Sequence, residues 1–218
     1  MAGSLPRCHR PRHVVVLAHP DRKSFNGLIA DTYCQTVASL GQEAIVRDLY
    51  AIGFDPLLKS TERAGSKPPS LGSDVIAERE TIGSSDVFVL VYPIWFGMPP
   101  AILKGYIDRV LGAGTTPRDL QKANGPGMLR DKLLVSITTS GASTHWLNQR
   151  HQLEAMRALL GNYLVKGFGM RGFEELHFGE TIEGLSQEFV DALIGRVADF
   201  ADEICQNAAD HSLLTPVA

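Results

Sequence analysis

Two stretches of this chain consist almost wholly of apolar residues, most of them β-branched: Val14–Ala18 and Val87–Tyr92. Strands that are buried on both faces show such continuous runs, whereas half-exposed strands alternate apolar and polar residues. The runs therefore predict a parallel sheet covered by helices on both faces. With three weaker stretches they give five expected strands: His13–Ala18, Ala44–Asp48, Val87–Tyr92, Leu133–Thr138 and Glu174–Phe178.

Helical patterns fill the intervals between these strands. They run from Phe25 to Leu40, from Asp74 to Ile82, from Ile102 to Leu111, from Leu147 to Tyr163 and from Phe189 to Ile204. Five strands that alternate with five helices predict a single α/β domain with a doubly wound, five-stranded parallel sheet. We place this domain at residues 13–207, between a disordered N-terminal tail (1–12) and a C-terminal tail (208–218).

Composition argues against several classes of function. The net charge of the 218 residues is −3, so no basic excess favours nucleic acid as a partner. Neither apolar run is long enough to span a bilayer, and the N-terminus lacks the apolar core of a signal peptide. Cys8, Cys34 and Cys205 are odd in number and lack the spacing of metal ligands. They indicate reduced thiols, a cytoplasmic protein and no metal site.

Three segments follow the carboxyl ends of expected strands, where ligands bind in open parallel sheets. The first contains Lys23 and Ser24 just before a helix, and the free N–H groups of a helix N-terminus bind phosphate. Ser24 is also consistent with a simple helix cap, and His19 with an ordinary loop residue. The second segment, Tyr92–Pro100, gathers aromatic residues at a sharp turn, as a flat heterocycle or an ordinary apolar turn would require. The third, Thr138–Ser143, has small residues that allow close approach to the backbone.

One motif is misleading. Residues Gly167–Gly172 match the GxGxxG pattern of dinucleotide-binding proteins. The pattern follows a helix and precedes a strand here, the reverse of the required order, so we interpret it as a helix-to-strand turn.

The three segments together resemble the NAD(P)H:quinone oxidoreductase family (DT-diaphorase-like), which has a flavodoxin-like fold. The resemblance covers roughly residues 14–178 and depends on the order and spacing of four motifs. These are Leu17-Ala18-His19 with Ser24-Phe25-Asn26; Asp48-Leu49-Tyr50 with Phe54-Asp55-Pro56; Trp95-Phe96-Gly97 with Pro100–Gly105 and Asp108-Arg109-Val110; and Ser136–Gly141. The loop after Pro93 is one residue shorter than in the mammalian-type enzymes.

The resemblance implies a set of site residues. The phosphate and ribityl end of a flavin would contact His19, Ser24, Phe25 and Asn26, and the nearby Lys23 could add positive charge to this part of the cofactor site. The isoalloxazine ring would lie against Pro93, Ile94, Trp95 and Phe96, with Thr138, Thr139, Ser140 and Gly141 at its edge. His145 and His151 lie close to the places of a family Tyr and His, which makes them candidate catalytic residues, with Trp146 as a wall of the substrate pocket. An exposed surface position is the alternative for both histidines.

The resemblance also implies an activity. It predicts transfer of two electrons, as hydride, from NAD(P)H through the flavin to a quinone or similar acceptor, with ping-pong kinetics. The family favours FAD, with FMN as the alternative, and is usually homodimeric with each active site at the subunit interface. A regulatory flavoprotein subunit of a transporter, an electron-transfer protein and an azo or nitro reductase are the competing interpretations.

Overall fold

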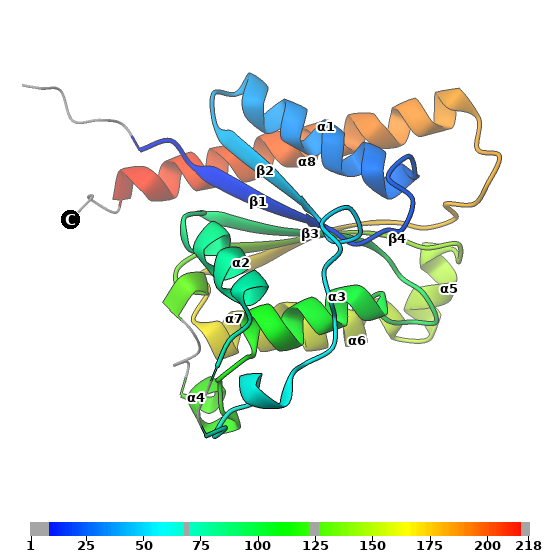
Figure 1. Cartoon of the computed structure of the whole chain (residues 1–218). Helices are drawn as coiled ribbons and strands as arrows, with labels where there is room; N and C mark the ends of the chain where they lie inside the picture. Colours follow the sequence, from blue (N-terminus) through cyan, green and yellow to red (C-terminus); the bar gives the residue numbers. More distant parts are fainter. Residues whose placement is uncertain (1–8, 68–69, 123–126, 215–218) are drawn as a thin grey trace, which may run out of the picture.

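The apolar runs form the middle of a five-stranded sheet in which every strand is parallel to its neighbours (Figure 1). The structure is a computed structural model that describes residues 9–67, 70–122 and 127–214. The strand order is β2-β1-β3-β4-β5. The strands are β1 (Arg12–Leu17), β2 (Glu43–Asp48), β3 (Val87–Pro93), β4 (Leu133–Thr139) and β5 (Gly172–Phe178). The expected fold class is confirmed, and the expected strand ends agree within two residues.

Helices cover both faces of the sheet (Figure 1). On one face, α1 (Phe25–Ser39) and α8 (Gln187–Leu214) pack against side chains such as Val15 and Val89. The other face, with Val14 and Val16, packs against α2 (Ser73–Gly83), α3 (Ala101–Tyr106), α6 (Gln152–Met156) and α7 (Tyr163–Phe168). Successive residues of β1 therefore enter different cores, which explains why its sequence is continuously apolar.

Secondary structure extends past the limits expected for the domain. Strand β1 begins at Arg12, and the Glu43 N–H donates to Pro11 O (3.0 Å) ahead of it. Helix α8 continues to Leu214, and Ala208 is buried in the core beneath it. The boundary after residue 207 and the tail assignment for residues 9–12 are therefore corrected. Residues 1–8 and 215–218 lie outside the described residues.

The expected helix from Leu147 to Tyr163 is interrupted. Helix α5 (Thr144–Gln149) ends before His151, whose left-handed backbone (φ 54°) starts a new direction. The chain then runs through α6, a π-helical turn (Arg157–Asn162) and α7. A second π-helical turn (Ile107–Leu111) follows α3. The misleading glycine motif is the expected turn, because Gly169 has φ 66° after α7 and β5 starts at Gly172.

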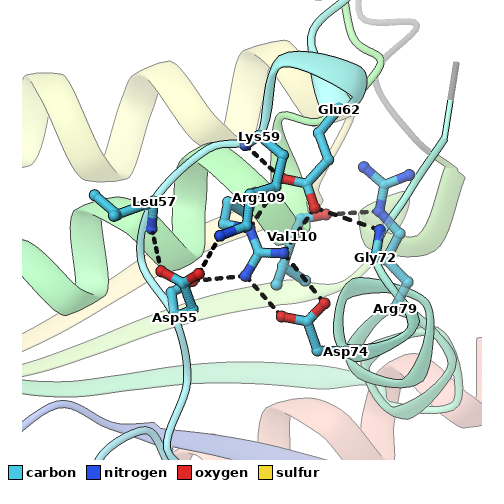
Figure 2. Close-up of polar contacts among 9 residues, drawn as sticks. All are labelled: Asp55, Leu57, Lys59, Glu62, Gly72, Asp74, Arg79, Arg109 and Val110. Atoms are coloured by element: carbon cyan, nitrogen blue, oxygen red, sulfur yellow. Dashed lines mark hydrogen bonds and ion pairs between the residues drawn. The ribbon is translucent and has the colours of Figure 1, made fainter.

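The two long connections contain short turns. The connection after β2 includes a 3₁₀ turn (Ser60–Glu62), and the one before β4 includes α4 (Pro117–Gln121) and a 3₁₀ turn (Gly127–Leu129). An ionic cluster holds the first of them against the π-helical turn that follows α3 (Figure 2). We call it the Arg109 anchor. Arg109 is buried, and its guanidinium bonds to both oxygens of Glu62 (2.9 and 2.7 Å), to Asp74 (2.6 Å) and to the Asp55 carbonyl (2.6 Å).

Backbone N–H groups also contribute to the Arg109 anchor. The Glu62 carboxylate also accepts the N–H groups of Lys59 (3.0 Å) and Gly72 (3.3 Å). The guanidinium and these donors lower the pKa of Glu62 to about 2. The cluster thereby ties the amino end of α2 and residues 55–62 to a single arginine.

No helix in the described part of the chain has the length and apolarity of a membrane span.

Cys34 and Cys205 are free thiols, and burial raises their pKa values to about 12 and about 11. Both are therefore protonated and unreactive at neutral pH.

Candidate functional site

A cleft of about 370 Å³ opens where β1, β3, β4 and β5 end. Helix α1 leaves β1 toward one face of the sheet and α3 leaves β3 toward the other, so the cleft lies at the point where the connections diverge. One segment after each of the four strands contributes to it. The lining residues are His19, Asp21, Ser24, Phe25, Asn26, Pro93, Ile94, Trp95, Thr139, Ser140, Gly141, Thr181, Ile182, Glu183 and Leu185.

The first segment presents the amino end of α1. The Ser24 hydroxyl accepts the Gly27 N–H (3.3 Å) and caps the helix. The N–H groups of Phe25 and Asn26 have no partner among the described residues. A Cβ atom at position 27 would lie 2.0 Å from the Arg22 carbonyl oxygen, so only glycine lets the preceding loop fold this closely onto the helix. The cleft thus contains a helix N-terminus whose two N–H groups have no partner among the described residues, an arrangement that favours anions.

The charges around this helix end have an unexpected sign. Arg22 is turned away from the cleft, because its guanidinium pairs with Asp31 and bonds to the Gly27 carbonyl (3.1 Å). Lys23 is exposed and does not line the cleft, although its place just before α1 had suggested a contact with the cofactor. The described lining residues include no Lys or Arg, and the acidic side chains among them are Asp21 and Glu183. Any bound phosphate must therefore be held by N–H groups and hydroxyls.

The second segment turns back on itself in four residues. Trp95 and Met98 exchange both backbone hydrogen bonds (2.9 and 3.0 Å), and Phe96 and Gly97 between them have positive φ angles of 50° and 76°. This is the geometry of a type I′ turn, which few residues other than glycine and asparagine adopt readily. Trp95 lines the cleft with its ring 5.7 Å from that of His19. Phe96 projects fully into solvent and does not line the cleft.

The third segment forms a wall of small residues. Thr139, Ser140 and Gly141 line the cleft, and the Gly141 N–H has no partner among the described residues. The Asn26 amide donates to the Thr139 hydroxyl (2.9 Å) and joins this wall to the first segment. The other amide atom, Asn26 Oδ1, is buried and has no partner in the part of the chain described. Thr138 faces a second, smaller cavity instead of the cleft.

The fourth segment was not found from the sequence. The segment that follows β5 closes the side of the cleft next to β4. Its lining residues are Thr181, Ile182, Glu183 and Leu185. No motif marks them. The topology alone could have found them, because residues after the carboxyl end of the strand next to β4 must lie near the same edge of the sheet.

The three residues expected on the substrate side lie elsewhere in the single chain. His145 and Trp146 are exposed on α5, and the Arg150 guanidinium lies 4.0 Å above the Trp146 ring. His151 is also exposed and pairs with Glu154 (2.9 Å). None of the three lines the cleft, so their assigned roles stay predictions.

Comparisons with known proteins agree with this architecture. A family model described as "Flavodoxin-like fold" matches residues 11–199. An uncharacterized NAD(P)H oxidoreductase of Haemophilus influenzae is 30% identical over 76% of this chain and 81% of its own length. NAD(P)H dehydrogenase [quinone] 1 of rat is 31% identical over 61% of this chain, and the match spans only 55% of the rat enzyme.

Solved structures share the fold at lower identity. An NAD(P)H:quinone oxidoreductase from Methanothermobacter marburgensis superposes with a TM-score of 0.74 and 24% identity, covering 88% of this chain and 98% of that one. An FMN-dependent NADH-azoreductase from Bacillus anthracis, solved in complex with FMN, superposes with a TM-score of 0.62 and 18% identity. The match covers 89% of this chain and 99% of that one. The chain therefore belongs to the family of proteins with the flavodoxin-like fold, and its sequence relatives include proteins named as NAD(P)H oxidoreductases.

Proposed function

We propose that this protein is a flavin-dependent NAD(P)H oxidoreductase that passes electron pairs to a quinone or a similar flat acceptor. The observation that carries the proposal is the cleft itself, with a helix N-terminus at one end and aromatic and small residues along its walls. The sequence relatives named as NAD(P)H oxidoreductases support the same activity.

The residues present fit the parts of a flavin. Asn26 Oδ1 is a buried acceptor without a partner among the described residues, and leaving such an atom unpaired costs about 1–3 kcal/mol. The hydroxyls of a ribityl chain are donors that would satisfy it. The free N–H groups of Phe25 and Asn26, with the helix dipole, would bind the phosphate without a cation. Trp95 and Ile94 would flank the flat ring.

The flavin, when bound, supplies hydride transfer between the nicotinamide and the acceptor. The protein would contribute orientation and charge stabilisation. The Gly141 N–H at the cleft wall has no partner in the described part of the chain and would stabilise negative charge on a ring edge. The apolar side chains of Ile94 and Ile182 would exclude water from one side of the cleft. FAD remains our expectation from the family and FMN the alternative, and heat release of the cofactor would identify it.

A homodimer would place the exposed residues at the active site. Phe96, Trp146 and Ile182 are large apolar side chains near the ends of β3, β4 and β5, with exposed fractions of 107%, 45% and 63%. A second subunit over this edge would bury them and complete the substrate pocket. It would also bring His145 and His151 into a setting where either could balance charge on the acceptor.

The test is direct. The purified protein should be yellow, bleach anaerobically with NADH or NADPH, and oxidise the nicotinamide with menadione in parallel-line kinetics. A colourless protein that binds neither FAD nor FMN would refute the proposal. Bound flavin with negligible turnover would instead favour a regulatory subunit, and much faster turnover with an azo dye than with menadione would favour an azoreductase.

A further inference from the structure

A histidine that does not line the cleft connects the residues of its third wall. His177, near the end of β5, places Nδ1 2.8 Å from the Thr138 hydroxyl and Nε2 3.2 Å from the Ser140 hydroxyl. Thr138 and Ser140 flank Thr139, so the imidazole spans the end of the neighbouring strand β4. On its other side His177 shares a cavity of about 40 Å³ with Thr138 and with residues of α6 and the following π-helical turn.

The hydrogen-bond directions in this group follow from one contact. The Ser140 hydroxyl donates its only proton to the Ala142 carbonyl (2.8 Å). Its oxygen must then accept from His177 Nε2, which therefore carries the ring proton. The bare Nδ1 accepts from the Thr138 hydroxyl. A chain of hydrogen bonds thus runs from Thr138 through His177 and Ser140 to Ala142, and we call it the His177 relay.

The relay continues into the loop after β5. The Ala142 carbonyl also accepts the Glu180 N–H (3.0 Å), and the Ser140 carbonyl accepts both the N–H and the hydroxyl of Thr181 (2.9 and 3.0 Å). Gly141, the residue between these anchored groups, lines the cleft with its N–H unpaired among the described residues. The position of that donor is therefore set by its two neighbours.

The surroundings keep the imidazole neutral. Burial lowers the pKa of His177 to about 4, so the relay keeps one proton pattern at neutral pH. The charged side chains that share its cavity are Arg157 and Glu175, which pair with each other (2.6 Å) and offset one another. Tyr92 of β3 also lines this cavity, and its hydroxyl accepts a hydrogen bond from the Ser136 hydroxyl (3.3 Å).

We propose that His177 is a positioning residue: through Ser140 it holds the 140–142 turn so that the Gly141 N–H stays available to a ligand in the cleft. The identity of that ligand as a flavin rests on the proposed function. The relay itself does not, because it is a property of the folded chain. The sequence motifs indicated Thr138 and Ser140 but gave no role to His177.

The experiment compares a variant that keeps the hydrogen-bonding pattern with one that removes it. H177Q retains an acceptor and a donor, whereas H177L has neither. H13Q is the matched control, because His13 is also buried and bonds to Tyr33 (2.9 Å) and Gln42 (2.8 Å). His13 lies at the amino end of β1, whereas the cleft lies at the carboxyl ends of the strands. Amide exchange and binding of FMN and FAD would be measured on the full chain.

We expect H177L to accelerate exchange of the Glu180 and Thr181 amides about tenfold, with H177Q and H13Q close to wild type there. We expect H177L to weaken flavin binding by about tenfold, a loss that H177Q restores and H13Q does not show. Imidazole ¹⁵N shifts of wild type should show protonated Nε2 and bare Nδ1, and T138V should shift the Nδ1 signal even if H177L fails to fold.

Two results would overturn the inference. One is a protonated Nδ1 on His177 at neutral pH. The other is H177L with wild-type exchange and wild-type flavin affinity. If wild type binds neither flavin, the proposed function fails, and the amide exchange and ¹⁵N data still decide whether His177 positions the turn.

Discussion

A Cβ atom at Gly27 would meet the Arg22 carbonyl oxygen at 2.0 Å and its carbon at 3.0 Å. Both are backbone atoms of the loop that forms the first wall of the cleft, so neither can move aside as a flexible side chain could. We expect G27A to lower the free energy of unfolding by about 1–3 kcal/mol and to weaken flavin binding. Urea unfolding and a flavin titration would measure the two effects.

Gly195 offers the matched control for this substitution. It lies inside α8, and an added Cβ there would have nothing within 4 Å. G195A should therefore stabilise the protein by about 0.5–1 kcal/mol, since alanine loses less backbone entropy in a helix. Equal effects of the two substitutions would show that the Arg22 contact does not constrain the loop.

His177 also gives the protein a defined sensitivity to acid. Its pKa in the folded state is about 4, below the ordinary 6.5, so the unfolded state binds a proton first as the pH falls. Stability should decline between about pH 6.5 and 4, with a contribution from His177 on the order of 1–2 kcal/mol after discounting for its partial exposure. Burial lowers the pKa of His13 in the same direction.

The measurement compares wild type with H177Q. The free energy of unfolding of H177Q, followed by urea titration at several pH values, should lack part of the decline seen in wild type. An unchanged difference between the two proteins across this range would contradict the assignment of a neutral His177.

At the scale of elements, the Arg109 anchor makes a long connection depend on one arginine. Glu62 is almost completely buried and accepts from Arg109, so E62Q leaves the buried guanidinium with Asp74 as its remaining carboxylate partner. Breaking such a pair typically costs about 3–5 kcal/mol. We expect E62Q to destabilise the protein and to expose residues 55–67 to trypsin. D108N is the control, because the exposed Lys104–Asp108 pair contributes little.

The same anchor has a second acid signature. The folded-state pKa of Glu62 is about 2 and its ordinary value is 4.5, so its stabilisation is complete above pH 4.5 and is lost as the pH falls toward 2. Wild type should lose stability across this lower window more steeply than E62Q. A parallel decline of both proteins would mean that Glu62 is not held ionised by Arg109.

The sequence predicted the elements that depend on local pattern and missed those that depend on tertiary contact. Continuous apolar runs identified β1 and β3, and Ser24 marked the start of α1 correctly. The π-helical turn before α7 has no such local signal; it contains Gly161, where a Cβ would lie 2.4 Å from the Phe173 ring, a tertiary contact that the local pattern does not reveal. The break at His151 is likewise a left-handed residue that helical periodicity does not reveal.

At the scale of the whole molecule, three of the four segments around the cleft were predicted because motifs mark them. The β5 segment has no motif, and Lys23 was assigned from proximity in sequence although its side chain is exposed. The places of His145, His151 and Trp146 were carried over from the family. Their use depends on a second subunit, which one chain's sequence does not describe.

The charges that line the cleft predict how the affinity for flavin responds to salt. Because Asp21 and Glu183 are acidic and no Lys or Arg is among the described lining residues, the cleft would bind phosphate through N–H dipoles. We expect the flavin dissociation constant to change less than about twofold between about 0.05 and 0.5 M NaCl. Fluorescence titration would measure it. A steep weakening with salt that K23Q abolishes would restore Lys23 to the site and contradict this prediction.

The acidic rim formed by Asp21 and Glu183 has a consequence for competition inside a cell. A small phosphate ester would gain the end of α1 but would meet two carboxylates, with no cation among the described lining residues to compensate. Only a molecule that also covers Trp95 and the Thr139–Gly141 wall recovers that loss through apolar contact. Sugar phosphates, which carry no flat ring, should therefore compete poorly with a flavin for the cleft.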